Sequence, residues 1–238
     1  MLEILKRQMK GLAYLLSHPH QLKWIIMRET YYRQRHQSKR KWVEWQKYDA
    51  SKHIEMMRAH SDVLQTSSLN VMRIKIFSDM VSRVGNNLKI LDVGCGDGVI
   101  SGPIMRMGNY VTSVELPTIA TLAQRCGVTS VVGGDAEQLG FASNSFDIII
   151  ASEVLEHLWE PRNFLDEAYR VLRNNGYLII ETPEGKESLN YDSHKHYFTV
   201  DLLKKMLDRR FNLCEVKRLK PTGSAQTPTI ILLLRKSL

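Results

Sequence analysis

Predicted strands and helices alternate from residue 88 to the end of the chain, and this alternation limits the possible folds more than any other feature. The predicted strands are 88–93, 110–115, 130–133, 146–151, 177–181, 212–218 and 229–235. The predicted helices are 99–107, 117–126, 153–159, 161–173 and 200–209. Such alternation indicates an α/β fold with a doubly wound sheet, whose parallel strands are covered by helices on both faces.

The last two predicted strands are connected differently. Only residues 219–228 lie between them, and Pro221, Gly223 and Pro228 interrupt any helix there. A parallel connection needs a crossover of about a dozen residues or more. The pair therefore predicts a hairpin, which places an antiparallel strand at or near the edge of the sheet.

The region before the sheet is helical and basic. Apolar residues recur at three- and four-residue steps over 1–16, and a second helical pattern covers 20–60. Residues 1–60 hold 13 Lys or Arg against 5 Asp or Glu, whereas the rest holds 20 of each, so the net charge of +8 belongs to this region. We predict a basic amphipathic helical extension over 1–66 and a folded domain over 67–238.

Composition narrows the class of protein. The chain is 43% hydrophobic and 24% charged, which is typical of globular proteins. No apolar run approaches the ~18–20 residues that span a membrane, and the first residues do not have the pattern of a secretory signal. Three cysteines without a Cys-x-x-Cys pair disfavour a disulfide scaffold or a cysteine zinc site. We therefore expect a cytoplasmic protein.

The strongest local motif is ILDVGCGDG, which follows the first predicted strand. Its glycines, Gly94, Gly96 and Gly98, would permit a tight turn and a close approach of a ligand to the backbone. The spacing differs from the Gly-x-Gly-x-x-Gly of dinucleotide-binding folds, and no Gly-Lys-Ser/Thr follows to form a P-loop. Taken alone, the motif also fits a tight turn without a ligand.

Two acidic residues follow the next two strands. Glu115 ends the second strand, where an acidic side chain in a doubly wound sheet accepts hydrogen bonds from ribose hydroxyls. Asp135 follows the third strand, where it could accept from an adenine amino group. Because the carboxyl ends of parallel strands meet at one edge of the sheet, these residues and the glycines predict a nucleoside pocket.

These motifs together resemble class I S-adenosylmethionine-dependent methyltransferases. ILDVGCGDG is similar to their first motif, VTSVE to their second-strand acidic motif, GDAEQLGFASNSFDIIIASEVLEHLWEP to their third and fourth, and RVLRNNGYLIIETP to their fifth. The resemblance covers about residues 70–235. It implies a Rossmann-like sheet of seven strands with a reversed final hairpin, and S-adenosylmethionine as a cofactor that leaves as S-adenosylhomocysteine.

The resemblance also implies which residues contact the cofactor. The residues of the first motif would shape the part of the pocket that holds the methionine and ribose portions of the cofactor, and Glu115 would bind the ribose. Those after the third strand would contact adenine, and those after the fourth would lie near the sulfonium. The implied contacts are Asp92, Gly94, Gly96, Gly98, Glu115, Asp135, Ala136, Ser152, Glu153 and Val154.

The segment after the fourth strand indicates the type of acceptor. Methyltransferases that act on base amino groups carry Asn/Asp-Pro-Pro-Tyr/Phe there, whereas this chain has ASEV at 151–154. The EVLEH string at 153–157 and HKHYFT at 194–199 resemble the ubiquinone-biosynthesis O-methyltransferases and their small-molecule relatives. We therefore expect methyl transfer to an oxygen of a small-molecule, lipid-linked or glycan acceptor.

An oxygen acceptor must lose a proton, and His157 is the candidate catalytic base because imidazole titrates near neutral pH. His194 and His196 are alternatives, and a purely structural role for His157 stays open.

A divalent metal is a further hypothesis. Glu153, Glu156 and His157 would share one face of a helix, with His196 as a fourth ligand, and such a set suits Mg²⁺ or Mn²⁺. The same triad resembles that of quinone-pathway and small-RNA 3′-end ribose methyltransferases, which use a divalent ion. The sequence leaves open whether this chain uses one.

Two other functions stay open. The basic, aromatic-rich region could hold a strand for an RNA ribose 2′-O-methyltransferase, but the neutral charge of residues 61–238 disfavours nucleic acid. The second alternative is a non-catalytic methyltransferase-like scaffold. The intact motif glycines, Glu115 and Asp135 argue against it, because a scaffold without activity does not need them. Residues 1–60 would serve as a peripheral anchor at the inner membrane face, a lid or a dimer contact. The sequence does not indicate an oligomeric state.

Overall fold

The computed structural model describes residues 35–59, 68–125, 128–221 and 227–237. The chain divides into two compact units, residues 1–48 and 49–238, while the predicted boundary at residue 66 stays a prediction. The helical patterns predicted over 1–16 and 20–34 lie outside the described residues.

In the first unit, the described residues enter helix α3 (Lys39–Ala59). The helix begins after Ser38, whose Oγ accepts a hydrogen bond from the Lys41 backbone N–H at 3.3 Å, as an N-cap does. Trp42 and Trp45 are buried, and the His36 ring stacks on Trp42 with centroids 5.2 Å apart. Two of the tryptophans in the basic region therefore pack in the interior instead of facing solvent.

The second unit contains a seven-stranded sheet in the order β3-β2-β1-β4-β5-β7-β6. The first five strands in the chain pair in parallel, and β7 runs antiparallel to both β5 and β6. The predicted reversed hairpin is thus confirmed. The strands are β1 (Lys89–Val93), β2 (Tyr110–Glu115), β3 (Val131–Gly133), β4 (Phe146–Ser152), β5 (Leu172–Pro183), β6 (Phe211–Leu219) and β7 (Thr229–Lys236).

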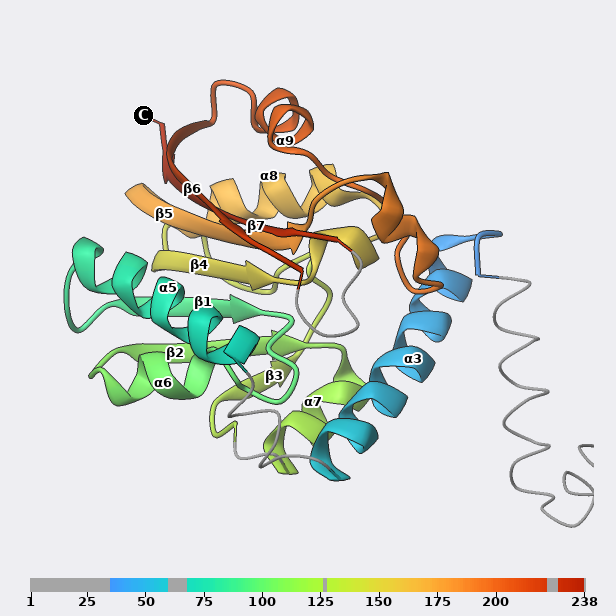
Figure 1. The fold of residues 1–238 in the computed structure, drawn as a ribbon. Coiled ribbons are helices and arrows are strands. Elements are labelled where there is room, and N and C mark those ends of the chain that lie inside the picture. Colours follow the sequence, from blue (N-terminus) through green and yellow to red (C-terminus); the bar gives the residue numbers. More distant parts are fainter. Residues whose placement is uncertain (1–34, 60–67, 126–127, 222–226, 238) are drawn as a thin grey trace, which may run out of the picture. The chain divides into compact units, whose positions relative to one another are not determined.

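Helices cover both faces of this sheet (Figure 1). Ile148 and Ile150 of β4 pack in one buried cluster with α5 and α6, whereas Ile149 packs in the other with α8 and α9. Two-sided burial explains why the strand is apolar without alternation. The helices are α5 (Ser68–Val84), α6 (Ser101–Arg106), α7 (Pro117–Arg125), α8 (Pro161–Val171) and α9 (Val200–Leu207), with 3₁₀ turns η1 (Leu155–His157) and η2 (Lys186–Asn190).

The segment after β4 differs from the prediction. We predicted a short helix over 153–159, but only the single turn η1 forms. Glu153 precedes η1 with φ 56°, and Leu158 follows it in an extended conformation. The positive φ of Glu153 and the extended Leu158 therefore limit the helical turn to three residues, and Pro161 begins α8.

Within the described ranges, no helix has the length and apolar character needed to cross a membrane.

Candidate cofactor and acceptor site

The three motif glycines form the predicted turn at the carboxyl end of β1. Gly94, Gly96 and Gly98 all have positive φ, at 72°, 53° and 79°, a region that glycine adopts without strain. A Cβ at Gly94 would lie only 2.5 Å from Val154 Cγ2, whereas one at Gly96 would meet nothing within 4 Å. The turn therefore packs tightly against the segment after β4 at one glycine and is open at another.

Glu115 lies beside this turn. Its Oε2 accepts a hydrogen bond from the Gly96 N–H at 3.2 Å, and its Oε1 accepts from the Leu116 N–H at 2.8 Å. Burial raises the pKa of Glu115, and these two backbone N–H groups lower it in part. Each carboxylate oxygen keeps a further lone pair, so Glu115 can still accept from a ligand hydroxyl.

Asp135 and Ala136 follow β3 at the same edge of the sheet. The Gly134 N–H donates to the Glu115 carbonyl at 2.8 Å, which joins this segment to the end of β2. Asp135 Oδ1 accepts from the Glu137 N–H at 2.9 Å, and Ala136 packs against the buried core. The structure thus brings the predicted nucleoside residues together at the ends of β1, β2 and β3, while their contact with a cofactor stays a prediction.

Asp92 has a different environment from the one we expected. Its side chain is only 2% exposed and accepts a hydrogen bond from the Ser101 hydroxyl at the start of α6. Burial raises the pKa of Asp92 to about 6, against the opposing effect of the Ser101 bond. Asp92 therefore ties the end of β1 to the start of α6, and its contact with a cofactor stays a prediction.

The sequence analysis missed Arg73 and Glu181, which surround Ser152. Arg73 Nε and Nη2 donate to Glu181 Oε1 and Oε2, each at 2.8 Å. Ser152 Oγ accepts from Arg73 Nη2 at 2.8 Å and donates to Glu181 Oε2 at 2.5 Å. A signal was available, because Arg73 interrupts an apolar stretch of α5 and Glu181 an apolar stretch of β5.

Acidic side chains gather at the ends of β4 and β5. Burial raises the pKa of Glu153 well above its usual range, and the charges of Glu156 and Glu181 raise it further. Burial likewise raises the pKa of Glu156 to about 7. Glu153 and Glu181 both act on the Arg73 guanidinium, so this part of the site holds one buried cation among acidic side chains.

Glu156, His157 and His194 form a compact cluster, with one ligand atom of each within 4.8 Å of the others. Glu156 Oε2 accepts from the Thr182 hydroxyl at 2.9 Å, and Glu156 Oε1 lies 3.9 Å from His157 Nε2. His157 Nδ1 lies 2.8 Å from the Ser193 carbonyl oxygen. Among the described residues, neither Glu156 Oε1 nor His194 Nδ1 has a hydrogen-bond partner, although both are buried.

This cluster changes the predicted metal set. The helical spacing argument for Glu153 was wrong, because its positive φ places it outside η1. His196 is also outside the cluster, with its Nε2 3.3 Å from the Trp159 carbonyl oxygen, and His194 takes the place that we expected for it. Burial and the neighbouring His157 lower the pKa of His194 to about 3, so its ring is neutral at physiological pH.

The loop from 185 to 198 holds His194 in place. The Gly185 N–H donates to the Phe198 carbonyl at 2.8 Å and closes the loop at its base. The Lys195 N–H donates to the Glu156 carbonyl at 2.7 Å, and Lys195 Nζ lies 4.3 Å from the Trp159 ring centroid. Aromatic and basic side chains therefore border the cluster on this side.

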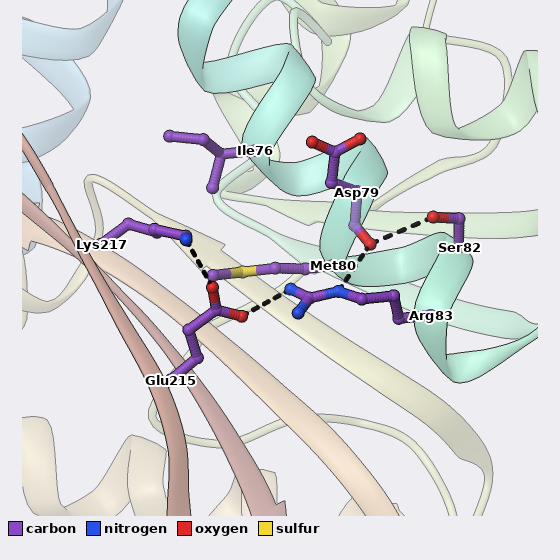
Figure 2. Close-up of a pocket in the computed structure, with 7 residues that line it drawn as sticks. All are labelled: Ile76, Asp79, Met80, Ser82, Arg83, Glu215 and Lys217. Atoms are coloured by element: carbon purple, nitrogen blue, oxygen red, sulfur yellow. Dashed lines mark hydrogen bonds and ion pairs between the residues drawn. The ribbon is translucent and has the colours of Figure 1, made fainter.

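A separate cavity of about 370 Å³ lies between α5 and β6 (Figure 2). Glu215 pairs there with Arg83 at 2.5 Å and with Lys217 at 2.8 Å, over an apolar base that includes Met80. The charges at its rim satisfy one another, and it contains no predicted site residue. We do not assign it to the cofactor or the acceptor.

The strand order and the residues gathered at the ends of β1–β3 define a Rossmann-like fold. Residues 91–180 match the family model described as a methyltransferase domain. This part of the chain is therefore similar to a methyltransferase domain, in agreement with the resemblance seen in its motifs.

Individual relatives agree with this assignment. The ubiquinone biosynthesis O-methyltransferase of Azorhizobium caulinodans is 36% identical over 101 residues, which is 40% of this chain and 40% of that protein. The match thus spans less than half of the length of this curated relative.

Solved structures support the fold. The N-methyltransferase NodS from Bradyrhizobium japonicum WM9, in complex with S-adenosylhomocysteine, has a TM-score of 0.66 at 18% identity and covers 79% of this chain and 99% of its own. The [4+2]-cyclase SpnF has a TM-score of 0.58 at 18% identity, covering 69% and 81%. Because a cyclase shares the fold, the reaction must be argued from the site.

Proposed function

We propose that this protein is an S-adenosylmethionine-dependent methyltransferase that transfers a methyl group to an oxygen of a small-molecule acceptor. The contact of Glu115 with the Gly96 N–H carries the proposal. A carboxylate of the kind that accepts hydrogen bonds from ribose hydroxyls lies directly against the glycine turn. The match to a methyltransferase domain and the ubiquinone O-methyltransferase relatives support the same reaction. No feature of the site favours the RNA or scaffold alternatives.

The proposal gives each part of the pocket a role. Asp135 and Ala136 would contact adenine, Glu115 the ribose, and the backbone of Gly94, Gly96 and Gly98 the thioether side of the cofactor. Val154, Ser152 and Glu153 would lie near the sulfonium. Asp92 would act from below, by holding the turn in place.

Arg73 is a natural partner for the carboxylate of the methionine portion. Its guanidinium donates to Ser152 and interacts electrostatically with Glu153 and Asp97. It therefore lies between the end of β4 and the glycine turn. If adenine lies over β3 and the ribose over β2, the rest of the cofactor extends towards β1 and β4. Arg73 would then meet its negatively charged end.

His157 remains the proposed base. Methyl transfer from a sulfonium is an in-line displacement, so most of the rate comes from positioning, and the acceptor proton must go to a nearby group. With Nδ1 donating to the Ser193 carbonyl, His157 would present the lone pair of Nε2 to the acceptor.

The cluster also fits a divalent cation, because one ligand atom of each residue lies within 4.8 Å of the others, and because Glu156 Oε1 and His194 Nδ1 are buried without a hydrogen-bond partner among the described residues. We propose that Glu156, His157 and His194 would hold it, in which case His157 Nε2 would be a ligand and would not serve as the base. One carboxylate and two imidazoles suit Mn²⁺ or Zn²⁺ better than the Mg²⁺ of our first hypothesis. When bound, such an ion lowers the pKa of a coordinated hydroxyl.

A lipid-linked or quinone-like acceptor would make contact with a membrane surface useful. We propose that residues 1–60 supply this contact through their excess of positive charge. Co-sedimentation of the full chain with anionic vesicles, and its loss with zwitterionic vesicles, would support the proposal. Equal recovery with both would contradict it.

Two measurements test the proposed reaction. Titration calorimetry with S-adenosylhomocysteine should show binding, and protein incubated with methyl-labelled S-adenosylmethionine and a cell lysate should label an organic, small aqueous or glycan fraction. Label in RNA would reverse the choice of acceptor. A His157→Ala variant that binds the cofactor normally but transfers methyl groups as fast as the wild type would exclude His157 as the base.

The metal proposal is tested separately. Protein dialysed against Mn²⁺ or Zn²⁺ should retain about one ion per chain by mass spectrometry, and Glu156→Gln should lose it. Retention in the Glu156→Gln variant would contradict the assignment of this carboxylate.

A further inference from the structure

Glu181 is a buried carboxylate that the proposed reaction does not use. Its side chain is fully buried, and that of Arg73 is 16% exposed. Glu181 binds the Arg73 guanidinium through both of its oxygens and also accepts from the Ser152 hydroxyl. A planar carboxylate that meets a guanidinium in this way fixes the orientation of the guanidinium as well as its position.

We propose that Glu181 is a positioning residue, which holds Arg73 and Ser152 in the orientation that receives the amino-acid portion of S-adenosylmethionine. This inference rests on the proposed function and deepens it. Arg73 and Ser152 would touch the cofactor, whereas Glu181 would act through them. The inference therefore predicts that a substitution of Glu181 weakens only the binding of the amino-acid end of the cofactor.

The backbone supports this role. Ser152 and Glu181 are register partners in the β4–β5 pair, and the Glu153 N–H donates to the Glu181 carbonyl at 2.9 Å. Glu181 therefore holds the end of β4 by its main chain and by its side chain. The residue held there, Glu153, has a positive φ that is unusual for a non-glycine residue, and such a conformation needs support from its surroundings.

The Arg73 guanidinium is charged, so its orientation matters for binding an anionic group. Burial lowers the pKa of Arg73, but the charges of Glu181, Glu153 and Asp97 outweigh this effect and raise it, so the guanidinium stays charged. Arg73 also donates to Asn70 Oδ1 at 3.1 Å, which ties it to its own helix. A charged group that three partners hold in one place can bind an anionic ligand without being reorganised.

A merely structural ion pair would have a different consequence. Its loss would loosen the pocket as a whole and weaken all ligands. Loss of a positioning residue at the amino-acid end would weaken S-adenosylhomocysteine and leave 5′-methylthioadenosine unaffected, because the latter has the same nucleoside and thioether but no amino-acid portion. Comparison of the two ligands therefore separates the two roles.

The test is calorimetry on the full chain with both ligands. Glu181→Gln should weaken S-adenosylhomocysteine about tenfold, as expected for a disturbed charge-assisted hydrogen bond, and leave 5′-methylthioadenosine within about twofold. Glu184→Gln is the matched control, because Glu184 lies close by in the chain and pairs with the exposed Arg218 at 2.8 Å. It should leave both affinities unchanged.

The outcomes are distinguishable. Equal weakening of both ligands, or of neither, in Glu181→Gln would overturn the inference while wild-type binding upholds the cofactor assignment. Absence of binding to either ligand in the wild type would overturn the proposed function itself, and the inference with it. Should Glu181→Gln fail to fold, Glu181→Asp keeps the charge but withdraws it by one methylene; a selective loss for S-adenosylhomocysteine then supports the inference, and unchanged affinity overturns it.

Discussion

The packing of Gly94 against Val154 provides a quantitative test of the geometry between the glycine turn and the segment after β4. Gly94→Ala introduces a Cβ at a φ of 72°, 2.5 Å from Val154 Cγ2. Gly96→Ala introduces the same methyl group at a φ of 53°, with nothing within 4 Å. The two variants share the conformational strain and differ in the clash.

The expected magnitudes follow from these numbers. Left-handed backbone costs an alanine about 1–2 kcal/mol, so Gly96→Ala should lower the free energy of unfolding by about that amount. Overpacking adds about 1–3 kcal/mol, so Gly94→Ala should lose about 2–5 kcal/mol in total. The difference between the two variants is the contribution of the contact with Val154.

The assay is urea unfolding of the full chain, followed by far-ultraviolet circular dichroism. Val154→Ala removes the clashing methyl group, so it should recover part of the loss in the Gly94→Ala background and none in the Gly96→Ala background. Equal destabilisation by the two glycine substitutions would refute the reasoning. So would additivity of Gly94→Ala with Val154→Ala, because residues in direct contact should be coupled.

Three further predictions concern buried polar groups. Glu115→Ala should weaken S-adenosylhomocysteine binding about tenfold or more by calorimetry, since charge-assisted hydrogen bonds contribute about 1.5–3 kcal/mol; unchanged affinity would contradict the ribose assignment. The raised pKa of Asp92, about 6 in the folded state, means that its favourable contribution is complete below its usual value of 3.8 and is lost as the pH rises through about 6. The free energy of unfolding of Asp92→Asn should therefore rise by up to about 3 kcal/mol relative to that of the wild type between about pH 4 and pH 7.5 in urea titrations. A difference between the two proteins that does not change with pH would refute the raised pKa. Thr182→Val removes the hydrogen bond to Glu156 and should destabilise by about 1–3 kcal/mol by the same method; a neutral effect would show that Glu156 finds another partner.

Local patterns were sufficient to predict most of the sheet. The bounds predicted for the second strand, 110–115, are those of β2, and the reversed final hairpin follows from the residues between β6 and β7. These features depend on residues close together in the chain. The predicted strand over 177–181 was too short, because β5 begins at Leu172, which pairs with Phe146 of β4 ahead of a break in the register that only the folded sheet reveals.

The parts of the site that depend on local turns could be predicted from the sequence. The parts that depend on contacts between residues far apart in the chain could not. An Arg or a Glu in an apolar segment indicates that a buried partner exists, but the partner of Arg73 lies 108 residues away. The choice between His194 and His196 is similar. Two residues of one type, two positions apart, face different surroundings once the loop closes between Gly185 and Phe198.

The end of β5 connects the two halves of the candidate site. Successive residues of a strand point to opposite faces, and here Glu181 holds Ser152 and Arg73 on one side, while Thr182 holds Glu156 on the other. If the proposed roles are right, the first contact sets the cofactor side and the second the acceptor side. Substitution of Glu181 should then alter the affinity for the cofactor, and substitution of Thr182 the rate of methyl transfer, although the two residues are adjacent in the chain.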